Sequence, residues 1–129
     1  MEKFEDLKDK TIVEITGNVG DEEMVFKTEE GGSYKLYHYQ DWCEYVNIVD
    51  IVGDREDIIG VPVLLAEEVK HEQDDNPQGV EIPDYQDSFT WTFYKLATIK
   101  GSITIRWYGE SNGYYSESVE FVKLKEILW

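Results

Sequence analysis

Apolar and polar residues alternate along most of the chain with a period of two, which is the spacing of a β-strand that buries one face. Stretches rich in Gly, Asn, Asp and Pro separate the alternating runs and supply the residues that tight turns need. The pattern predicts strands over the ranges 11–16, 23–28, 33–39, 45–52, 61–69, 89–98, 102–108 and 114–122. The first three form a predicted antiparallel meander, because the connections GNVGDE and EEGGS are too short for a helical crossover.

Helical spacing is confined to two short places. Phe4 and Leu7 lie three residues apart and predict a short helix or turn that places two apolar side chains on the body of the protein. In GDREDIIG, Asp54 is a candidate N-cap and Gly60 is placed to end the turn. Residues 70–88, KHEQDDNPQGVEIPDYQDS, have almost no apolar periodicity and predict a long flexible loop.

These elements predict an α+β, mostly antiparallel β fold with one or two short helices. We expect about seven or eight strands in a single curved sheet, a roll or a partly closed barrel. The chain has 129 residues, contains no internal repeat and carries no low-complexity linker. We therefore expect one domain over residues 1–129, long enough to bury about two-thirds of its unfolded surface.

Strand periodicity divides the last three strands into two faces. The expected core face consists of Phe89, Trp91, Phe93, Ile103, Ile105, Trp107, Tyr115, Val119 and Phe121. The opposite face consists of Thr90, Thr92, Tyr94, Thr104, Arg106, Tyr108, Tyr114, Ser116, Ser118 and Glu120. The turn GESNG would join the last two strands as a hairpin, with Asn112 and Gly113 supplying the positive backbone dihedral angle.

The second of these faces is a candidate binding surface, because hydroxyl groups and tyrosine rings surround one guanidinium group. Tyrosine offers a large contact area at a low cost in conformational entropy. The expected binding residues are Tyr94, Arg106, Tyr108, Asn112, Tyr114 and Ser116. The alternative is ordinary cross-strand pairing on a solvated face, with Arg106 neutralised by Glu117 or Glu120.

The charge balance restricts the partners. There are 28 acidic and 12 basic residues, for a formal net charge of -16. Such a chain repels phosphate backbones and anionic lipid, which argues against direct binding to nucleic acid or to a membrane surface. Solubility alone explains the charge, and a protein partner with a basic surface is the alternative.

Motifs for catalysis or metal binding are missing from the sequence. There is no GxSxG, no HExxH, no phosphate-binding glycine loop and no CxxC pair. A zinc site from His38, Cys43 and His71, with Asp41 and Glu44 nearby, is a minor alternative, because His38 and Cys43 would face opposite sides of a regular strand. We therefore expect no enzyme activity, no catalytic residue, no metal ligand and no cofactor.

The single cysteine excludes an internal disulfide, and the N-terminal residues MEKFEDLKDK lack the apolar stretch of a signal peptide. No apolar run approaches the length that would span a membrane. A reducing cytoplasm is the expected compartment.

Four segments carry a family resemblance: LYHYQDWCEYV, GDREDIIGVPVLLAEEV, WTFYKLATIKGSITIRW and YGESNGYYSESVEF. Together they resemble a family of small uncharacterised proteins of bacteriophages, prophages and bacteria, a domain of unknown function. The resemblance extends from about Lys10 to Val122. The family pattern has two adjacent cysteines where this chain has Trp42 and Cys43, which weakens any thiol or metal chemistry taken from the family.

The resemblance implies a compact domain in a bacterial host cell. By analogy with other small acidic phage proteins, we expect a non-enzymatic binding protein that acts on a host or phage protein, with interference in antiphage defence as one such role. One alternative is a protein that binds a nucleotide-like small molecule through Arg106 and its tyrosines. Another is a structural phage component that self-associates, for example as a homodimer.

Overall fold

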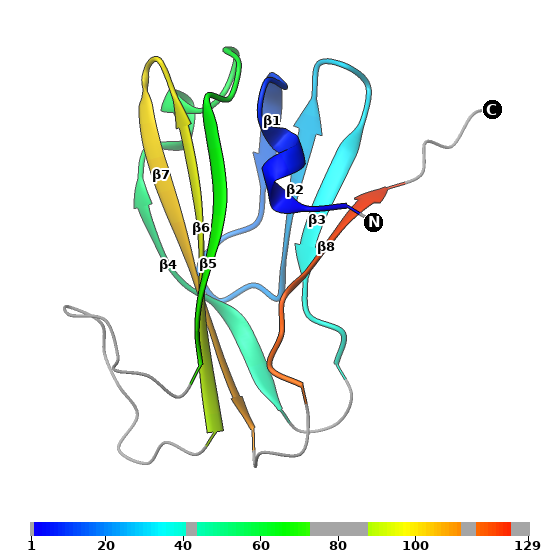
Figure 1. Cartoon of the computed structure of the whole chain (residues 1–129), viewed down its shortest axis with the longest axis vertical. Coiled ribbons are helices and arrows are strands. Elements are labelled where there is room, and N and C mark those ends of the chain that lie inside the picture. The colour runs from blue at the N-terminus through cyan, green and yellow to red at the C-terminus, as the bar shows by residue number, and fades with distance from the viewer. Residues whose placement is uncertain (1, 41–43, 73–87, 112–115, 125–129) are drawn as a thin grey trace.

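The computed structural model describes residues 2–40, 44–72, 88–111 and 116–124, which form two four-stranded antiparallel sheets that pack against each other (Figure 1). The strand orders are β1-β2-β3-β8 and β4-β7-β6-β5. The strands are β1 (Ile12–Thr16), β2 (Glu23–Thr28), β3 (Ser33–Tyr37), β4 (Tyr45–Gly53), β5 (Leu65–Glu72), β6 (Ser88–Thr98), β7 (Gly101–Ser111) and β8 (Glu120–Leu124). Two 3-10 turns, η1 (Phe4–Leu7) and η2 (Arg55–Asp57), complete the described elements.

The mostly antiparallel β prediction is confirmed, whereas the prediction of a single curved sheet, a roll or a partly closed barrel is wrong. After β3 the chain crosses to a second sheet, and β8 later returns to pair with β3. Each sheet has an apolar inner face, and the two inner faces exclude water by covering each other. Within the described ranges the helical content is limited to the two 3-10 turns.

The β1-β2-β3 meander is confirmed, and its outer face is charged. Lys27 Nζ lies 3.4 Å from Glu14 Oε2, and Lys35 Nζ lies 3.7 Å from Glu23 Oε2. Lys35 also lies over the ring of Tyr37, 4.7 Å from its centroid. These pairs are typical of a face that remains in water.

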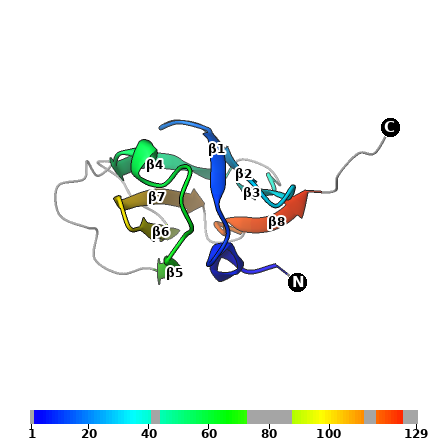
Figure 2. The same ribbon diagram turned by 90° about the horizontal axis from the view of Figure 1, so that it is seen from above.

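The predicted helix near the N-terminus is confirmed as η1, which lies on the open side of the sandwich between β5 and β8 (Figure 2). The Phe4 ring enters the core there. Its centroid lies 6.1 Å from that of Phe26, 4.8 Å from that of Tyr94 and 5.5 Å from that of Phe121. This one ring therefore contacts side chains of both sheets and closes the gap between them.

Short segments cover two of the outer sheet edges. On the β5 edge, Glu5 Oε2 accepts a hydrogen bond from the Glu68 backbone N–H at 3.1 Å. On the β4 edge, the Gly20 N–H donates to the Ile48 carbonyl at 2.7 Å, and the Ile48 N–H donates to the Asp21 carbonyl at 3.0 Å. Among the described residues no strand pairs with the outer edge of β8. An uncovered edge is able to accept another extended chain.

Two sequence signals for the segment between β4 and β5 hold. Asp54 caps η2, since its Oδ1 accepts a hydrogen bond from the Glu56 N–H at 3.0 Å. Pro62 forms only an isolated bridge with Thr11, so β5 begins at Leu65 and not at residue 61. The predicted loop over 70–88 is shorter in the structure, because β5 extends to Glu72 and β6 begins at Ser88. Residues 73–87 lie outside the described part of the chain.

The predicted hairpin between the last two strands is wrong, because β8 pairs with β3 in the other sheet. Residues 116–119 are not a strand, and 112–115 lie outside the described ranges. Gly109 on β7 explains the path of the chain. A Cβ atom there would lie 2.8 Å from the Glu117 carbonyl oxygen, so glycine allows this segment to pass close to β7 on its way to the first sheet.

Candidate functional site

The register of β6 against β7 decides which side chains face outward. Phe93 lies opposite Arg106, and Tyr94 lies opposite Ile105. The predicted core position of Ile105 is confirmed, as are those of Ile103 and Trp107. For β6 the predicted face is wrong, because Phe89, Trp91 and Phe93 lie on the outer face while Thr90, Thr92 and Tyr94 face the first sheet. Trp91 is nevertheless buried, at 2% exposure, and so is Tyr108 on β7, at 4%.

The outer face of the second sheet is therefore aromatic. We define the aromatic face as the outward side chains of Tyr45, Asn47, Asp50, Val52, Leu65, Val69, His71, Phe89, Trp91, Phe93, Arg106 and Tyr108. The ring centroids of Trp91 and Tyr108 are 4.8 Å apart, and those of His71 and Phe93 are 5.4 Å apart. The centroids of Trp91 and Phe93 are 6.2 Å apart, so tilted ring contacts continue across β5, β6 and β7.

Arg106 is paired on this face, but with a residue that the sequence did not suggest. Its Nη2 lies 3.1 Å from Asp50 Oδ2, and the two side chains are 21% and 38% exposed. A β-bulge between Ile48 and Asp50 shifts the alternation of β4, which turns Asp50 outward although Ile48 faces the core. The expected neutralisation by Glu117 or Glu120 is wrong.

The six predicted binding residues are dispersed. Arg106 and Tyr108 share the aromatic face, where the Tyr108 hydroxyl donates to Glu110 Oε2 at 2.7 Å. Tyr94 lies buried on the opposite face of the same sheet. Ser116 lies on the exposed segment before β8, where its Oγ is 2.7 Å from that of Ser118. Asn112 and Tyr114 lie outside the described residues.

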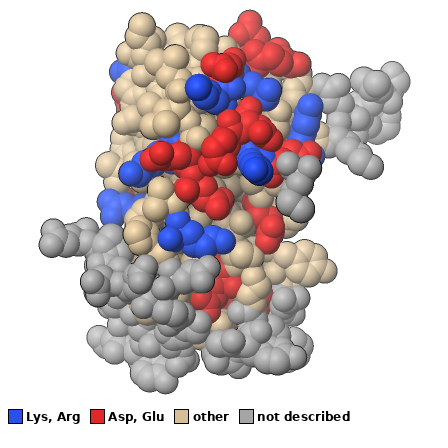
Figure 3. All heavy atoms as spheres, viewed as in Figure 1, with Lys and Arg blue, Asp and Glu red and all other residues tan. Residues whose placement is uncertain are grey.

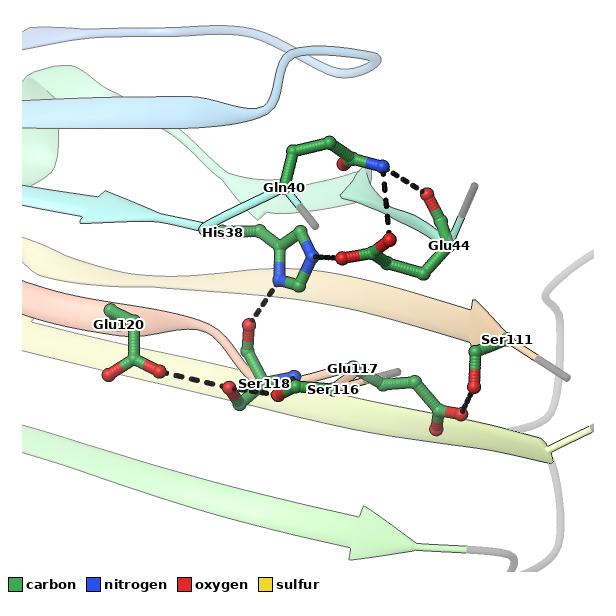
Figure 4. Close-up of polar contacts among 8 residues, drawn as sticks. All are labelled: His38, Gln40, Glu44, Ser111, Ser116, Glu117, Ser118 and Glu120. Atoms are coloured by element: carbon green, nitrogen blue, oxygen red, sulfur yellow. Dashed lines mark hydrogen bonds and ion pairs between the residues drawn. The ribbon is translucent and has the colours of Figure 1, made fainter. Parts of the chain in front are cut away.

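A buried polar cluster, missed as a unit by the sequence reading, links the two sheets (Figure 4). His38 follows β3, Glu44 precedes β4, and their side chains are 2% and 0% exposed. His38 Nε2 lies 2.8 Å from Glu44 Oε2, and Nδ1 lies 2.7 Å from the Ser118 carbonyl oxygen. Gln40 Nε2 donates to the Glu44 carbonyl at 2.7 Å. The spacing H-x5-E was the available signal, and it has no characteristic meaning by itself.

The partners of His38 determine how many protons the cluster holds. A backbone carbonyl can only accept, so Nδ1 carries a hydrogen. The contact between Nε2 and Oε2 needs one more hydrogen, which belongs either to the ring or to the carboxyl group. In both cases the pair is neutral overall, which lowers the free-energy cost of removing it from water. The cluster therefore acts as a clamp between β3, β4 and the segment before β8.

A second carboxylate at this end of the sandwich is also held by hydroxyl groups. Glu117 Oε1 accepts a hydrogen bond from the Thr90 hydroxyl at 2.9 Å, and Oε2 accepts one from the Ser111 hydroxyl at 2.5 Å. These bonds attach the segment before β8 to the ends of β6 and β7. Each of the two carboxylate oxygens of Glu117 thus accepts a hydrogen bond from another residue of the domain.

The structure does not assemble the zinc site considered from the sequence. His38 lies in the clamp, while His71 lies on the aromatic face beside Phe93. Cys43 and Asp41 fall outside the described ranges. Within those ranges, no group of three or more His, Cys, Asp or Glu side chains has the arrangement of a metal site.

The surroundings of Tyr94 strongly perturb the titration of its hydroxyl group. Burial raises the pKa of Tyr94 far above the ordinary value, and the carboxylates of Glu68, Glu120 and Glu5 add to the effect. The Tyr94 hydroxyl has no hydrogen bond of standard geometry, although Glu68 comes close enough to act on it. The folded protein therefore keeps this phenol neutral.

This raised pKa predicts a loss of stability in alkali. Stabilisation from the neutral phenol is complete below pH 10, the pKa in the unfolded chain, and is lost as the pH rises above it. We expect wild type to lose about 1.4 kcal/mol more of its free energy of unfolding than Tyr94→Phe between pH 8 and pH 11. Urea unfolding at both pH values measures the difference. The exposed Tyr39→Phe is the control and should behave like wild type; equal losses in all three proteins would contradict the assignment.

None of the helical segments in the described ranges is long and apolar enough to cross a membrane. Comparison with curated proteins and with solved structures gives no match. A family model does match, and it covers residues 5–121, which include every described strand except the end of β8. The chain therefore belongs to the family described as Domain of unknown function (DUF7448).

Proposed function

We propose that this domain is a non-enzymatic binding protein that contacts a protein partner through the aromatic face. The difference between the two outer faces carries the proposal. The outer face of the first sheet holds Lys and Glu pairs that suit a solvated surface. The outer face of the second sheet has one such pair, Lys95 with Glu67, but it also exposes apolar groups at Tyr45 (56%), Val52 (47%) and Leu65 (44%), near Arg106.

This composition matches that of protein interfaces. Aromatic residues and arginine are enriched in interfaces and in their energetic hot spots, whereas Lys and Glu are depleted. Phe93 lies directly opposite Arg106, so a ring and a guanidinium group form the middle of the face. Both belong to the two central strands of the sheet, which hold side chains more rigidly than loops do.

The internal polar groups support a binding role over a catalytic one. Both ring nitrogens of His38 have hydrogen-bond partners. The carboxylate groups of Glu44 and Glu117 form hydrogen bonds with other residues of the fold. A catalytic acid or base needs a proton within reach of a substrate. These groups hold segments of the chain together instead.

The charge and the family resemblance supply the expected setting. A net charge of -16 favours a partner with a basic surface and speeds its association at low salt. The resemblance to phage and prophage proteins suggests a host or phage protein in the bacterial cytoplasm, including a component of antiphage defence. In that setting a small binding domain acts by occupying a surface of its target.

One observation favours a second candidate function, the binding of a nucleotide-like small molecule. A guanidinium group has five donors, and the described contacts of Arg106 use one ion pair with Asp50. The remaining donors could bind the oxygens of a phosphate group. Native mass spectrometry of the purified protein would then show a bound small mass that Arg106→Gln abolishes.

The first function predicts a partner that depends on this face. Tagged protein should capture one stoichiometric partner from extracts of its own host cells, and the double variant Arg106→Gln, Tyr45→Ala should reduce the capture by at least about tenfold. The matched control is Lys35→Gln, Tyr37→Ala, which makes the same kinds of change on the outer face of the first sheet. Quantitative mass spectrometry of the eluates measures the ratio, and urea unfolding confirms that both variants fold. Equal capture by the two variants would contradict a role for the aromatic face.

A further inference from the structure

One buried amide group on the aromatic face has an end without a partner. The Asn47 side chain is 7% exposed, and its Oδ1 has no hydrogen-bond partner. Its Nδ2 donates a hydrogen bond to the Tyr45 hydroxyl at 2.7 Å. A half-turn of the amide would exchange its two ends, so one end stays unpaired in either orientation. A buried polar atom without a partner is uncommon in proteins and calls for an explanation.

The register of β4 against β7 groups three further side chains with this amide. Asn47 lies opposite Tyr108, and Tyr45 lies opposite Glu110. The Tyr108 hydroxyl donates to Glu110 Oε2 at 2.7 Å, so a hydrogen bond runs along each of the two strands. Side chains directly opposite each other are about 5 Å apart at Cβ, and diagonal neighbours are about 7–8 Å apart. We call these four residues the Asn47 site.

The carboxylate of the Asn47 site lacks a counter-charge. On the described strands, the outer face of the second sheet carries the carboxylates of Asp50, Glu67 and Glu110. Asp50 pairs with Arg106 and Glu67 pairs with Lys95, but no ion pair in the described ranges includes Glu110. Elsewhere acidic and lysine side chains lie close together, as the face in Figure 3 shows. A carboxylate beside the unpaired amide end favours a ligand that donates hydrogen bonds and carries positive charge.

The spacing of the acceptors and the exposed ring narrow the kind of cation. Tyr45 is 56% exposed, so its ring offers a surface on which a cation can stack. Glu110 and Asn47 offer acceptors at diagonal positions of the two strands. A guanidinium group is planar, stacks on aromatic rings and carries five donors around its edge, so it can reach acceptors on two sides. An ammonium group is a compact and strongly hydrated point charge, which suits this spacing less well.

The site has to open before a ligand reaches the amide oxygen, because Asn47 Oδ1 is closed to solvent. The hydrogen bond that holds the amide runs to the hydroxyl of Tyr45, an exposed side chain. Exposed side chains change rotamer within nanoseconds. A turn of Tyr45 would break this bond and free the amide to rotate toward an incoming donor.

We propose that the Asn47 site receives an arginine side chain of the protein partner. Its guanidinium group stacks on the Tyr45 ring and donates hydrogen bonds to Glu110 and to the Asn47 amide oxygen. This inference rests on the proposed function and deepens it, because it gives the basic partner one anchoring residue. Arginine is enriched among the residues that dominate binding energy at interfaces. The nearby Arg106 is paired with Asp50, which reduces its repulsion of an incoming cation.

NMR titration of the isotope-labelled protein with acetyl-arginine methylamide at low salt tests the site without the partner. We expect the side-chain amide signals of Asn47 and the backbone signals of Tyr45 and Glu110 to shift. Glu110→Gln should raise the dissociation constant about fivefold, and Asn47→Leu about threefold. The matched control Glu67→Gln removes the same charge from the same outer face and should raise it less than about twofold. Circular dichroism checks folding, and the conservative Glu110→Gln carries the comparison if Asn47→Leu does not fold.

Two further probes separate charge from shape. Acetyl-citrulline methylamide has the shape of the arginine probe without its charge, and should bind at least about fivefold more weakly. Acetyl-lysine methylamide binding as tightly as the arginine probe would overturn the choice of a guanidinium group. Unshifted Asn47 amide signals in wild type would overturn the site. Equal weakening by Glu110→Gln and Glu67→Gln would also overturn it and indicate only a general attraction between charges.

Partner capture distinguishes failure of this inference from failure of the proposed function. We expect Asn47→Leu and Glu110→Gln each to reduce the capture of the partner from host-cell extracts. Loss of capture in the Arg106→Gln, Tyr45→Ala variant, with full capture in both of these single variants, would overturn the arginine anchor and leave the proposed function standing. Full capture in all three variants would overturn the proposed function and the anchor with it.

Discussion

His38→Ala lowers the free energy of unfolding by about 3–5 kcal/mol, because removal of one partner of a buried pair strands the other. Glu44, with no exposed side-chain surface, loses the group that shares its proton, and the Ser118 carbonyl loses its donor. The clamp joins β3, β4 and the segment before β8, so the cost should affect the whole domain and not one loop. Urea unfolding followed by far-UV circular dichroism measures the loss.

A double-mutant cycle separates the His38–Glu44 pair from the packing of its members. We expect Glu44→Met alone to be destabilising, and His38→Leu combined with Glu44→Met to recover much of the loss, because two apolar groups leave no buried charge without a partner. Additive losses from the two single variants would show that the pair has no coupling energy, which would contradict the clamp.

Trp107→Ala should cost a similar amount, about 3–5 kcal/mol, through the cavity that it leaves between the sheets. Trp107 is fully buried on the inner face of β7, in the central part of the second sheet. A domain of this size has a total stability of about 5–15 kcal/mol, so the variant should melt far below wild type or fail to fold. Differential scanning calorimetry measures the change.

Trp107→Phe provides the comparison for that variant. The Trp107 Nε1 has no hydrogen-bond partner in the described structure, so exchange for a phenylalanine ring loses no polar contact and leaves a smaller cavity. We expect less than half of the loss seen with alanine. The exposed Ile99→Ala at the tip of the β6-β7 connection should change the stability little. A Trp107→Ala protein as stable as Ile99→Ala would contradict the inward position of this ring.

Alternation located nearly all the strands but assigned the wrong face of β6 to the core. Phe89, Trp91 and Phe93 share one face, with Thr90 and Thr92 on the other, so the period over these residues favours the face that points outward in the structure. The residues at the end of the same strand indicate which face points inward. Lys95 shares a face with Phe93 and Leu96 shares one with Tyr94, and a lysine is rarely placed between two sheets. On β7 every inward candidate was apolar, and there the prediction was correct.

The separation into two sheets and the clamp depend on contacts between distant residues, which local patterns do not encode. A strand at 114–122 next to 102–108 suggests a hairpin, whereas the Gly109 approach to Glu117 carries the chain to the other sheet. His38 and Glu44 looked like separate candidate ligands, and their pairing depends on how the connection after β3 is folded. Asp50 reaches Arg106 through a bulge, which has no clear sequence signature here.

The return of β8 to β3 also has a consequence for the order of folding. His38 and Ser118, which meet at this junction, are 80 residues apart in the chain, whereas β5, β6 and β7 pair with their neighbours in sequence. Closing so long a loop costs more chain entropy than forming hairpins, and topologies rich in such contacts fold slowly. We expect the β5-β6-β7 meander to form early and the docking of β8 to be a late, rate-limiting event. A chain emerging from the ribosome would have to expose its first sheet without this strand until almost its entire length had been made.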